Sequence, residues 1–184
     1  MTMSQLSIPA LKHIPELDPG FIPASLWNQA FRDKCSAEGS RKIRIAVLRP
    51  DGTGTVHSEE ILTNESEESS DLNFRLIERV VKFLLWSCGG TRIVLEHAPG
   101  LAKALSDQYR EGGVREFDVD YSRRFFGDTL TISSEPTETF PSPKKAPDSD
   151  SEIGLKGNRI GFDLGGSDRK CAAVIDGEVV FSEE

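Results

Sequence analysis

The sequence predicts a small α/β or α+β domain, and three observations support this fold class. Patterns typical of strands and helices alternate between residues 41 and 132. Within this region, residues 72–86 carry an apolar side chain every three or four positions, which is the spacing of an amphipathic helix packed on a core. The chain has 184 residues, of which 37% are hydrophobic, so it can form one medium domain or two small ones.

Residues 1–40 are predicted to form an irregular N-terminal arm with one short helix. Four prolines lie between positions 9 and 23, and each removes a backbone hydrogen-bond donor and interrupts any longer element. Over residues 23–35, the side chains of Leu26, Trp27 and Phe31 fall on one side of a helix. We therefore expect the short helix there.

The small domain of residues 41–132 is predicted to begin with a β-hairpin. Residues 43–48 are strand-like, a Pro-Asp-Gly-Thr-Gly turn follows, and residues 55–62 can return as the partner strand. Residues 63–71 are rich in acids and serines and have almost nothing apolar to bury, so we expect a solvated loop. Asp71 is predicted to cap the helix that follows.

The second half of this domain is predicted to contain two helices and short strands. The helix of residues 72–86 ends at a Gly-Gly pair, which is typical of a helix C-terminus. Residues 93–95 are expected to form a short buried strand, and a second helical pattern runs over residues 101–109. Residues 115–117 and 129–132 are predicted as further short strands.

A change of composition separates this domain from the end of the chain. Residues 133–158 hold four prolines, five serines and five acidic residues, with Phe140 as their one aromatic residue. Such a segment cannot build a core, so we predict a flexible linker. Strand-like sequence resumes over residues 159–184, which we interpret as the start of a second domain.

Net charge and cysteine content restrict the possible partners and compartment. The formal charge is -8, from 22 Lys and Arg against 30 Asp and Glu, which argues against nucleic acid and anionic membrane surfaces as partners. Apolar stretches stay well below the ~18 residues of a membrane span. Three cysteines without a C-x-x-C pair are typical of a reducing compartment, so we expect a cytoplasmic protein without a membrane anchor.

One group of basic and aromatic residues admits two interpretations. Arg123 and Arg124 stand among three aromatic residues, Tyr121, Phe125 and Phe126. Such a composition occurs in nucleic-acid-binding patches. Because the chain is acidic, we instead expect an amphipathic turn that packs these aromatic side chains inward.

The order strand, Asp, apolar residue, Gly-Gly-Ser, strand begins at residue 160 and is typical of a phosphate-binding hairpin. Asp163 ends the first strand, where its carboxylate can hold a magnesium ion through water. Gly165 and Gly166 lack Cβ atoms, allow positive φ, and let backbone N–H groups face phosphate oxygens. Ser167 can donate to a phosphate oxygen, and two basic residues just beyond can add charge. The candidate cofactor-binding residues are Asp163, Gly165, Gly166, Ser167, Arg169 and Lys170.

These residues resemble the first phosphate motif of the ROK family, the bacterial sugar kinases and sugar-responsive repressors of the actin, hexokinase and Hsp70 ATPase superfamily. The resemblance begins with the Ile-Gly-Phe-Asp-Leu-Gly-Gly-Ser run of residues 160–167 and ends near the Asp-Gly turn of residues 176–177. It covers only residues 158–184. Two departures are Ser167, where the family has Thr, and the charged residues 168–170, where family members begin an apolar strand.

The resemblance implies that residues 159–184 are the first β-hairpin of an actin-like, ribonuclease-H-like ATPase domain, with ATP and Mg²⁺ as cofactors and a small-molecule sugar as substrate of the complete protein. It also implies that Asp163 serves the metal-nucleotide and that Gly165 and Gly166 approach the phosphates. In such proteins the second phosphate motif and the catalytic aspartate lie further along the chain. We therefore expect an N-terminal fragment, inactive alone and without a catalytic residue, of a carbohydrate kinase-like protein.

Two alternatives stay open. In the first, the chain is a non-catalytic ligand- or protein-binding module, residues 41–132 recognise the partner, and the Gly-Gly-Ser segment is only a turn. In the second, it belongs to a sugar-responsive ROK transcriptional regulator, although the element order of residues 43–96 lacks the three-helix start of a winged helix-turn-helix. A homo-oligomer is compatible with every hypothesis.

Overall fold

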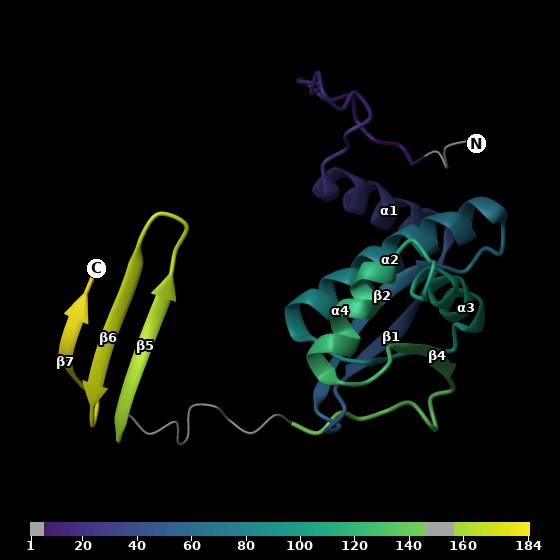
Figure 1. Ribbon diagram of the computed structural model, residues 1–184. Coiled ribbons are helices and arrows are strands. Elements are labelled where there is room, and N and C mark those ends of the chain that lie inside the picture. Colours follow the sequence, from purple (N-terminus) through teal and green to yellow (C-terminus); the bar gives the residue numbers. More distant parts are fainter. Residues whose placement is uncertain (1–5, 146–156) are drawn as a thin grey trace. The chain divides into compact units, whose positions relative to one another are not determined.

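The computed structural model describes residues 6–145 and 157–184, which belong to two compact units, Met1–Lys145 and Ala146–Glu184 (Figure 1). The boundary between the units falls within the predicted linker of residues 133–158. Residues 146–156 of that linker lie outside the described residues.

The first unit is a mixed sheet with helices, in agreement with the predicted α/β class. Its described elements are α1 (Ala24–Glu38), β1 (Ser40–Leu48), β2 (Gly54–Leu62), α2 (Glu67–Cys88), β3 (Arg92–Glu96), α3 (Pro99–Gln108), α4 (Glu116–Phe126) and β4 (Thr131–Glu135). The strand order is β2-β1-β3-β4. Strand β1 is antiparallel to β2 and β3, whereas β3 and β4 are parallel, because α3 and α4 form the crossover between them.

Both faces of β1 are covered, each by a different group. Ile43, Ile45 and Val47 point to one face and are fully buried in the main core, which also contains buried residues of α1, α2 and α3. Ala46, at an alternate position, belongs with its neighbours to a second small group on the other face. Phe140 packs against that group, so the segment after β4 covers the outer face of the sheet.

The long helix α2 begins earlier than its apolar pattern predicts. Its first residue is Glu67, and Ser66 is the N-cap, with its hydroxyl oxygen accepting a hydrogen bond from the Ser69 backbone N–H at 3.1 Å. Asp71, predicted as the cap, lies inside the helix. Glu67 and its neighbour in the first turn are acidic, and negative charge there is favourable to the helix dipole. The acidic composition therefore marks a helix start in place of a loop.

Two other expectations differ from the structure in the second half of the unit. Residues 115–117, predicted as a strand, lead into and begin helix α4. The predicted inward packing of the aromatic residues is wrong, since Tyr121 and Phe125 are exposed and only Phe126 is half-buried. The first residues of the expected linker, 133–135, complete β4 because they gain the parallel backbone pairing with β3.

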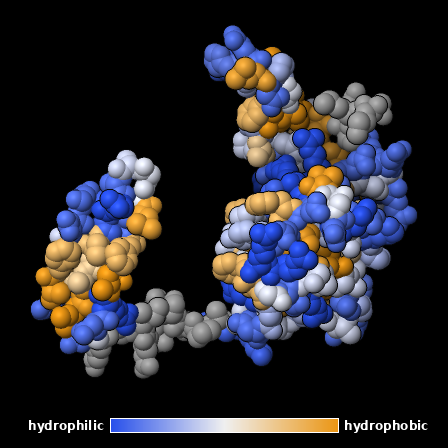
Figure 2. All heavy atoms as spheres, viewed as in Figure 1, coloured by the Kyte–Doolittle hydropathy of each residue, from blue (hydrophilic) through white to orange (hydrophobic). Residues whose placement is uncertain are grey.

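The second unit is a three-stranded antiparallel sheet of β5 (Asn158–Leu164), β6 (Arg169–Ile175) and β7 (Glu178–Glu183). Ile160, Phe162 and Leu164 alternate along β5 and therefore share one face, where they are 67%, 71% and 75% exposed. Figure 2 shows hydrophobic residues along this sheet. Among the described residues of the unit, no helix covers this apolar face.

Candidate functional site

The turn between β5 and β6 brings all six predicted cofactor-binding residues into one short segment. Asp163 of β5 lies directly opposite Lys170 of β6 in the strand register. Residues 165–167 form the turn and are exposed, and Arg169 is the first residue of β6. The order of residues in the sequence thus produces the predicted hairpin.

The alternation of β5 separates the polar side chains from the apolar ones. Asp163 and Lys170 are partners across the two strands and lie on one face of the sheet. Phe162 and its partner Cys171 lie on the opposite face. A ligand held by the carboxylate of Asp163 would therefore contact the polar face of the sheet.

Close approach of the Asp168 side chain, and not positive φ, favours glycine at position 165 of this turn. Gly165 and Gly166 both have negative φ, contrary to the predicted use of positive values. A Cβ on Gly165 would lie 2.5 Å from Oδ1 of Asp168 and 3.2 Å from its carbonyl oxygen. A Cβ on Gly166 would meet nothing within 4 Å, so the backbone of this residue is open to a ligand.

The lysine of the turn is engaged by carboxylates. Lys170 Nζ lies 3.0 Å from Glu184 Oε1 and 3.7 Å from Asp168 Oδ2. These groups are about half exposed or more, and solvent-exposed ion pairs contribute little energy. An incoming phosphate therefore competes with weak partners for this ammonium group. Asp163 and Lys170 also line a shallow hollow of about 570 Å³ on the sheet.

The oxygen donors of the turn suit a magnesium-nucleotide in their chemistry. Mg²⁺ prefers oxygen ligands and keeps several waters, so one carboxylate such as Asp163 is sufficient where phosphates supply further oxygens. Among the residues that the structure describes, no group of three or more His, Cys, Asp or Glu side chains is arranged to hold a metal ion. The role of Asp163 toward magnesium stays a prediction.

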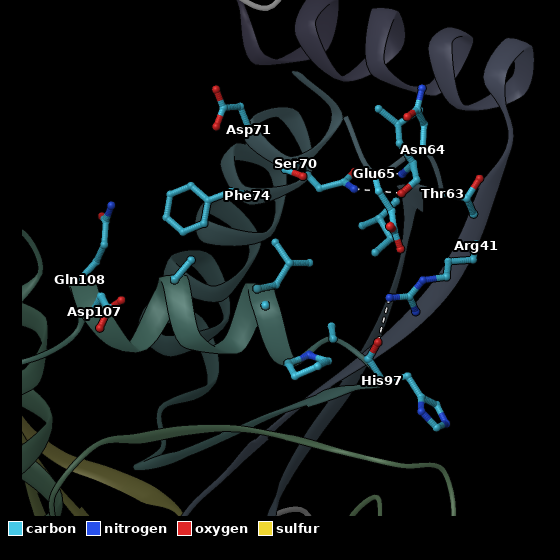
Figure 3. Close-up of a pocket in the computed structure, with 18 of the residues that line it drawn as sticks. Arg41, Thr63, Asn64, Glu65, Ser70, Asp71, Phe74, His97, Asp107 and Gln108 are labelled. Carbon is cyan, nitrogen blue, oxygen red and sulfur yellow. Dashed lines mark hydrogen bonds between the residues drawn. The ribbon is translucent and has the colours of Figure 1, made fainter. Parts of the chain in front are cut away.

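A larger hollow, which the sequence analysis missed, lies in the first unit (Figure 3). This groove has a volume of about 1110 Å³ and is lined by the β2–α2 connection, α2, the residues after β3, α3 and the loop after α3. Phe74 and Leu101 supply apolar walls, whereas Arg41, Asp71 and Asp107 supply charges. The combination of an aromatic surface with groups of both signs suits a polar organic ligand.

Hydrogen bonds to backbone groups fix two sides of the groove. Asn73 is buried; its Oδ1 accepts from the Leu62 N–H and its Nδ2 donates to the Leu62 carbonyl, both at 2.9 Å. Arg41 Nη2 donates to the His97 carbonyl at 2.9 Å, as Figure 3 shows. His97 has a φ of 47°, in the left-handed region that non-glycine residues rarely adopt.

On the outer face of the sheet, an ion-pair network holds the segment after β4. Glu96 accepts from Arg44 at 2.8 Å (Nε) and 2.5 Å (Nη2), and from the Thr137 hydroxyl at 2.8 Å. The Arg44 guanidinium carbon also lies 4.3 Å from the centre of the Phe140 ring. The pKa of Glu96 is lowered to about 2, and the hydrogen bonds from Arg44 are the largest cause. The hydrogen bond from Thr137 lowers this pKa further, whereas burial of the carboxylate opposes the shift. All these partners are occupied with one another, so the network is structural.

Comparisons with protein-family models, with curated proteins and with solved structures found no match to this chain. In the described part of the chain, the helices are all too short or too polar to cross a membrane. The hypothesis for the β5–β6 turn therefore depends on its residues and its geometry.

Proposed function

We propose that the chain is the N-terminal portion of a ROK-like carbohydrate kinase, in which the β5–β6 turn binds the phosphates of Mg-ATP. The observation that carries the proposal is the hairpin. Its Asp and Gly-Gly-Ser residues stand at the junction of two paired strands, with Asp163 opposite Lys170 and the backbone of Gly166 open. These are the groups that a phosphate-binding turn needs at that junction.

The uncovered face of the second unit supports the same proposal. Ile160, Phe162 and Leu164 expose a continuous apolar row. A small sheet needs a packed layer on its apolar face for stability, and ATPase domains of this superfamily provide such layers. In the proposal, further residues of the complete protein cover this row.

In this function, each residue of the turn contributes charge or position. Mg²⁺ would neutralise phosphate charge, with Asp163 orienting its waters. Ser167 donates to a phosphate oxygen, and Lys170, on the same face as Asp163, adds positive charge. Arg169 is the register partner of Leu164, so it lies on the opposite face of the sheet. The complete kinase transfers the γ-phosphoryl group of ATP to a sugar hydroxyl oxygen, and a downstream aspartate accepts the hydroxyl proton. In this proposal the base lies outside these 184 residues, and we expect the 184 residues alone to bind ATP weakly.

Calorimetry with Mg-ATP on the complete protein tests this function. Asp163→Ala should weaken binding about 10- to 100-fold, the usual effect of removing a group that orients a metal site. Glu178→Ala, at the opposite end of the sheet beside the β6–β7 turn, is the matched control and should bind as wild type does. Equal binding by wild type and Asp163→Ala would contradict the proposal.

The groove of the first unit favours a second candidate function, the non-catalytic binding of a small polar ligand. Its volume, about 1110 Å³, is slightly above the usual range of small-molecule sites, and its walls combine Phe74 with charged groups. In this alternative the Gly-Gly-Ser segment is only a turn. Absent Mg-ATP binding in both wild type and Asp163→Ala would favour it.

A further inference from the structure

A row of aromatic side chains on α4 is exposed. Phe117, Tyr121 and Phe125 recur every four residues and are 70%, 46% and 69% exposed. Trp86 of α2 extends the row, with its ring centre 4.9 Å from that of Tyr121 and 6.2 Å from that of Phe117. We call these four residues the aromatic face.

The aromatic face is held rigidly by the residues beneath it. Trp86 Nε1 donates to the buried Asp118 Oδ1 at 2.7 Å, so the polar atom of the indole is satisfied and its ring is presented to solvent. Ser122, on the buried side of α4, donates to the Gly90 carbonyl at 2.9 Å. Several stacked, preoriented rings form an apolar patch of the kind that monomers rarely leave in water, and such residues are enriched in interface cores.

The charges beside this row differ between the two halves of α4. Glu116 and Asp120 lie in the first half of the helix, and the basic residues Arg123 and Arg124 lie in its last turn. By helical spacing, Glu116, Asp120 and Arg124 form one stripe next to the aromatic row. A helix that is acidic at one end and basic at the other is complementary to a second copy of itself in antiparallel orientation.

Helix geometry supports this pairing quantitatively. We place the two-fold axis of the dimer at Tyr121. Along the helix axis, Arg124 of one copy then lies midway between Glu116 and Asp120 of the other copy. At about 1.5 Å rise per residue, it lies about 3 Å along the axis from each of them. Phe117 of one copy meets Phe125 of the other, since both are four residues from the axis.

We propose that the aromatic face is the interface of a homodimer in which two α4 helices pack antiparallel about Tyr121. The aromatic rings supply most of the affinity. In the single chain, Asp120 pairs with Arg123 and with Arg124, each at 2.8 Å. The dimer exchanges these exposed pairs for pairs between copies, so the charges determine mainly the orientation of the two helices.

A second copy fits this surface better than other partners do. An acidic partner, including nucleic acid, would meet Glu116 and Asp120 at one end of α4. A basic peptide would meet Arg123 and Arg124 at the other end. Only a partner that carries both signs in the reverse order avoids like-charge contacts, and α4 itself is such a partner.

Sedimentation velocity of the full chain over a range of concentrations tests the dimer. The double variant R123E/R124E makes the charged stripe acidic throughout, and E116K/D120K makes it basic throughout. Each variant repels its own copies, so we expect its dimer dissociation constant to rise about 100-fold. An equimolar mixture of the two variants pairs opposite charges everywhere and should form dimers as wild type does. Dimer formation in the mixture also shows that both variants are folded.

Two single variants separate the aromatic contribution from the charges. Tyr121→Ser removes the ring on the proposed axis and should make the chain monomeric. Leu17→Ser is the matched control, since Leu17 is fully exposed and lies outside the aromatic face, and this variant should dimerise as wild type does. A monomeric wild type, a dimer indifferent to Tyr121→Ser, or a mixture of folded charge variants that stays monomeric would each overturn the proposal.

Discussion

Replacing Glu96 by Gln is expected to destabilise the first unit in a pH-dependent way. The Glu96 side chain is only 14% exposed and accepts three hydrogen bonds, two from Arg44 and one from Thr137. These partners lower its pKa from 4.5 to about 2 in the folded chain. Glutamine keeps the size of the side chain but removes the charge that Arg44 binds.

The size of the effect follows from the pKa of Glu96. A fall from 4.5 to about 2 corresponds to about 3–4 kcal/mol at most, since one pKa unit is worth about 1.4 kcal/mol. The Arg44 side chain is 39% exposed, and solvent screens an ion pair that it reaches. We therefore expect Glu96→Gln to lower the free energy of unfolding by about 1–2 kcal/mol at pH 7.

The sign of the pH dependence is fixed by the direction of the pKa change. A carboxylate whose pKa is lowered by folding stabilises the folded state above pH about 4.5, and this stabilisation is lost as the pH falls toward 2. The difference between wild type and Glu96→Gln should therefore shrink to less than about half between pH 7 and pH 3.

Urea unfolding followed by tryptophan fluorescence measures this difference, because Trp27 and Trp86 both belong to the first unit. Glu111→Gln, at an exposed position outside the network, is the control and should change the free energy of unfolding little. A Glu96→Gln effect of equal size at pH 7 and pH 3 would refute the electrostatic reasoning.

Three further substitutions test the packing of the first unit. Asn73→Ala leaves both backbone groups of Leu62 without their buried partner, and should cost about 2–4 kcal/mol in urea unfolding. Gly90→Ala would bring a Cβ to 2.7 Å from the Leu48 carbonyl oxygen, and thermal unfolding should show a loss of about 1–3 kcal/mol. Phe140→Ala uncovers the outer face of the sheet, and hydrogen exchange in residues 137–144 should become faster while the main core keeps its protection.

Local patterns were sufficient to predict several elements of the fold. The hairpin of β1 and β2, the long helix α2 and the strand β3 follow from apolar periodicity and turn residues, and each lies near its predicted position. Helix α4 shows the limit of this approach. Its buried side carries the polar residues Asp118 and Ser122, whose hydrogen bonds are made to Trp86 and Gly90. These distant partners turn the aromatic residues outward, and no pattern within α4 indicates them.

The same distinction applies to the candidate sites. The β5–β6 turn is a contiguous run of residues, so the sequence alone predicted which side chains it gathers. The groove and the Glu96 network combine residues of separate elements, and Arg44 meets Glu96 only because β1 and β3 are neighbours in the sheet. Sites of this kind depend on strand order, which a single sequence does not indicate.

The most direct test of the proposed function is nuclear magnetic resonance of the complete protein, labelled with ¹⁵N at glycine and titrated with Mg-ATP. The proposal predicts saturable shifts of the Gly165 and Gly166 amide signals, since these residues form the β5–β6 turn, with no change at Gly100 and Gly112 in the groove. Shifts confined to the groove glycines, or no shift at any glycine, would contradict it.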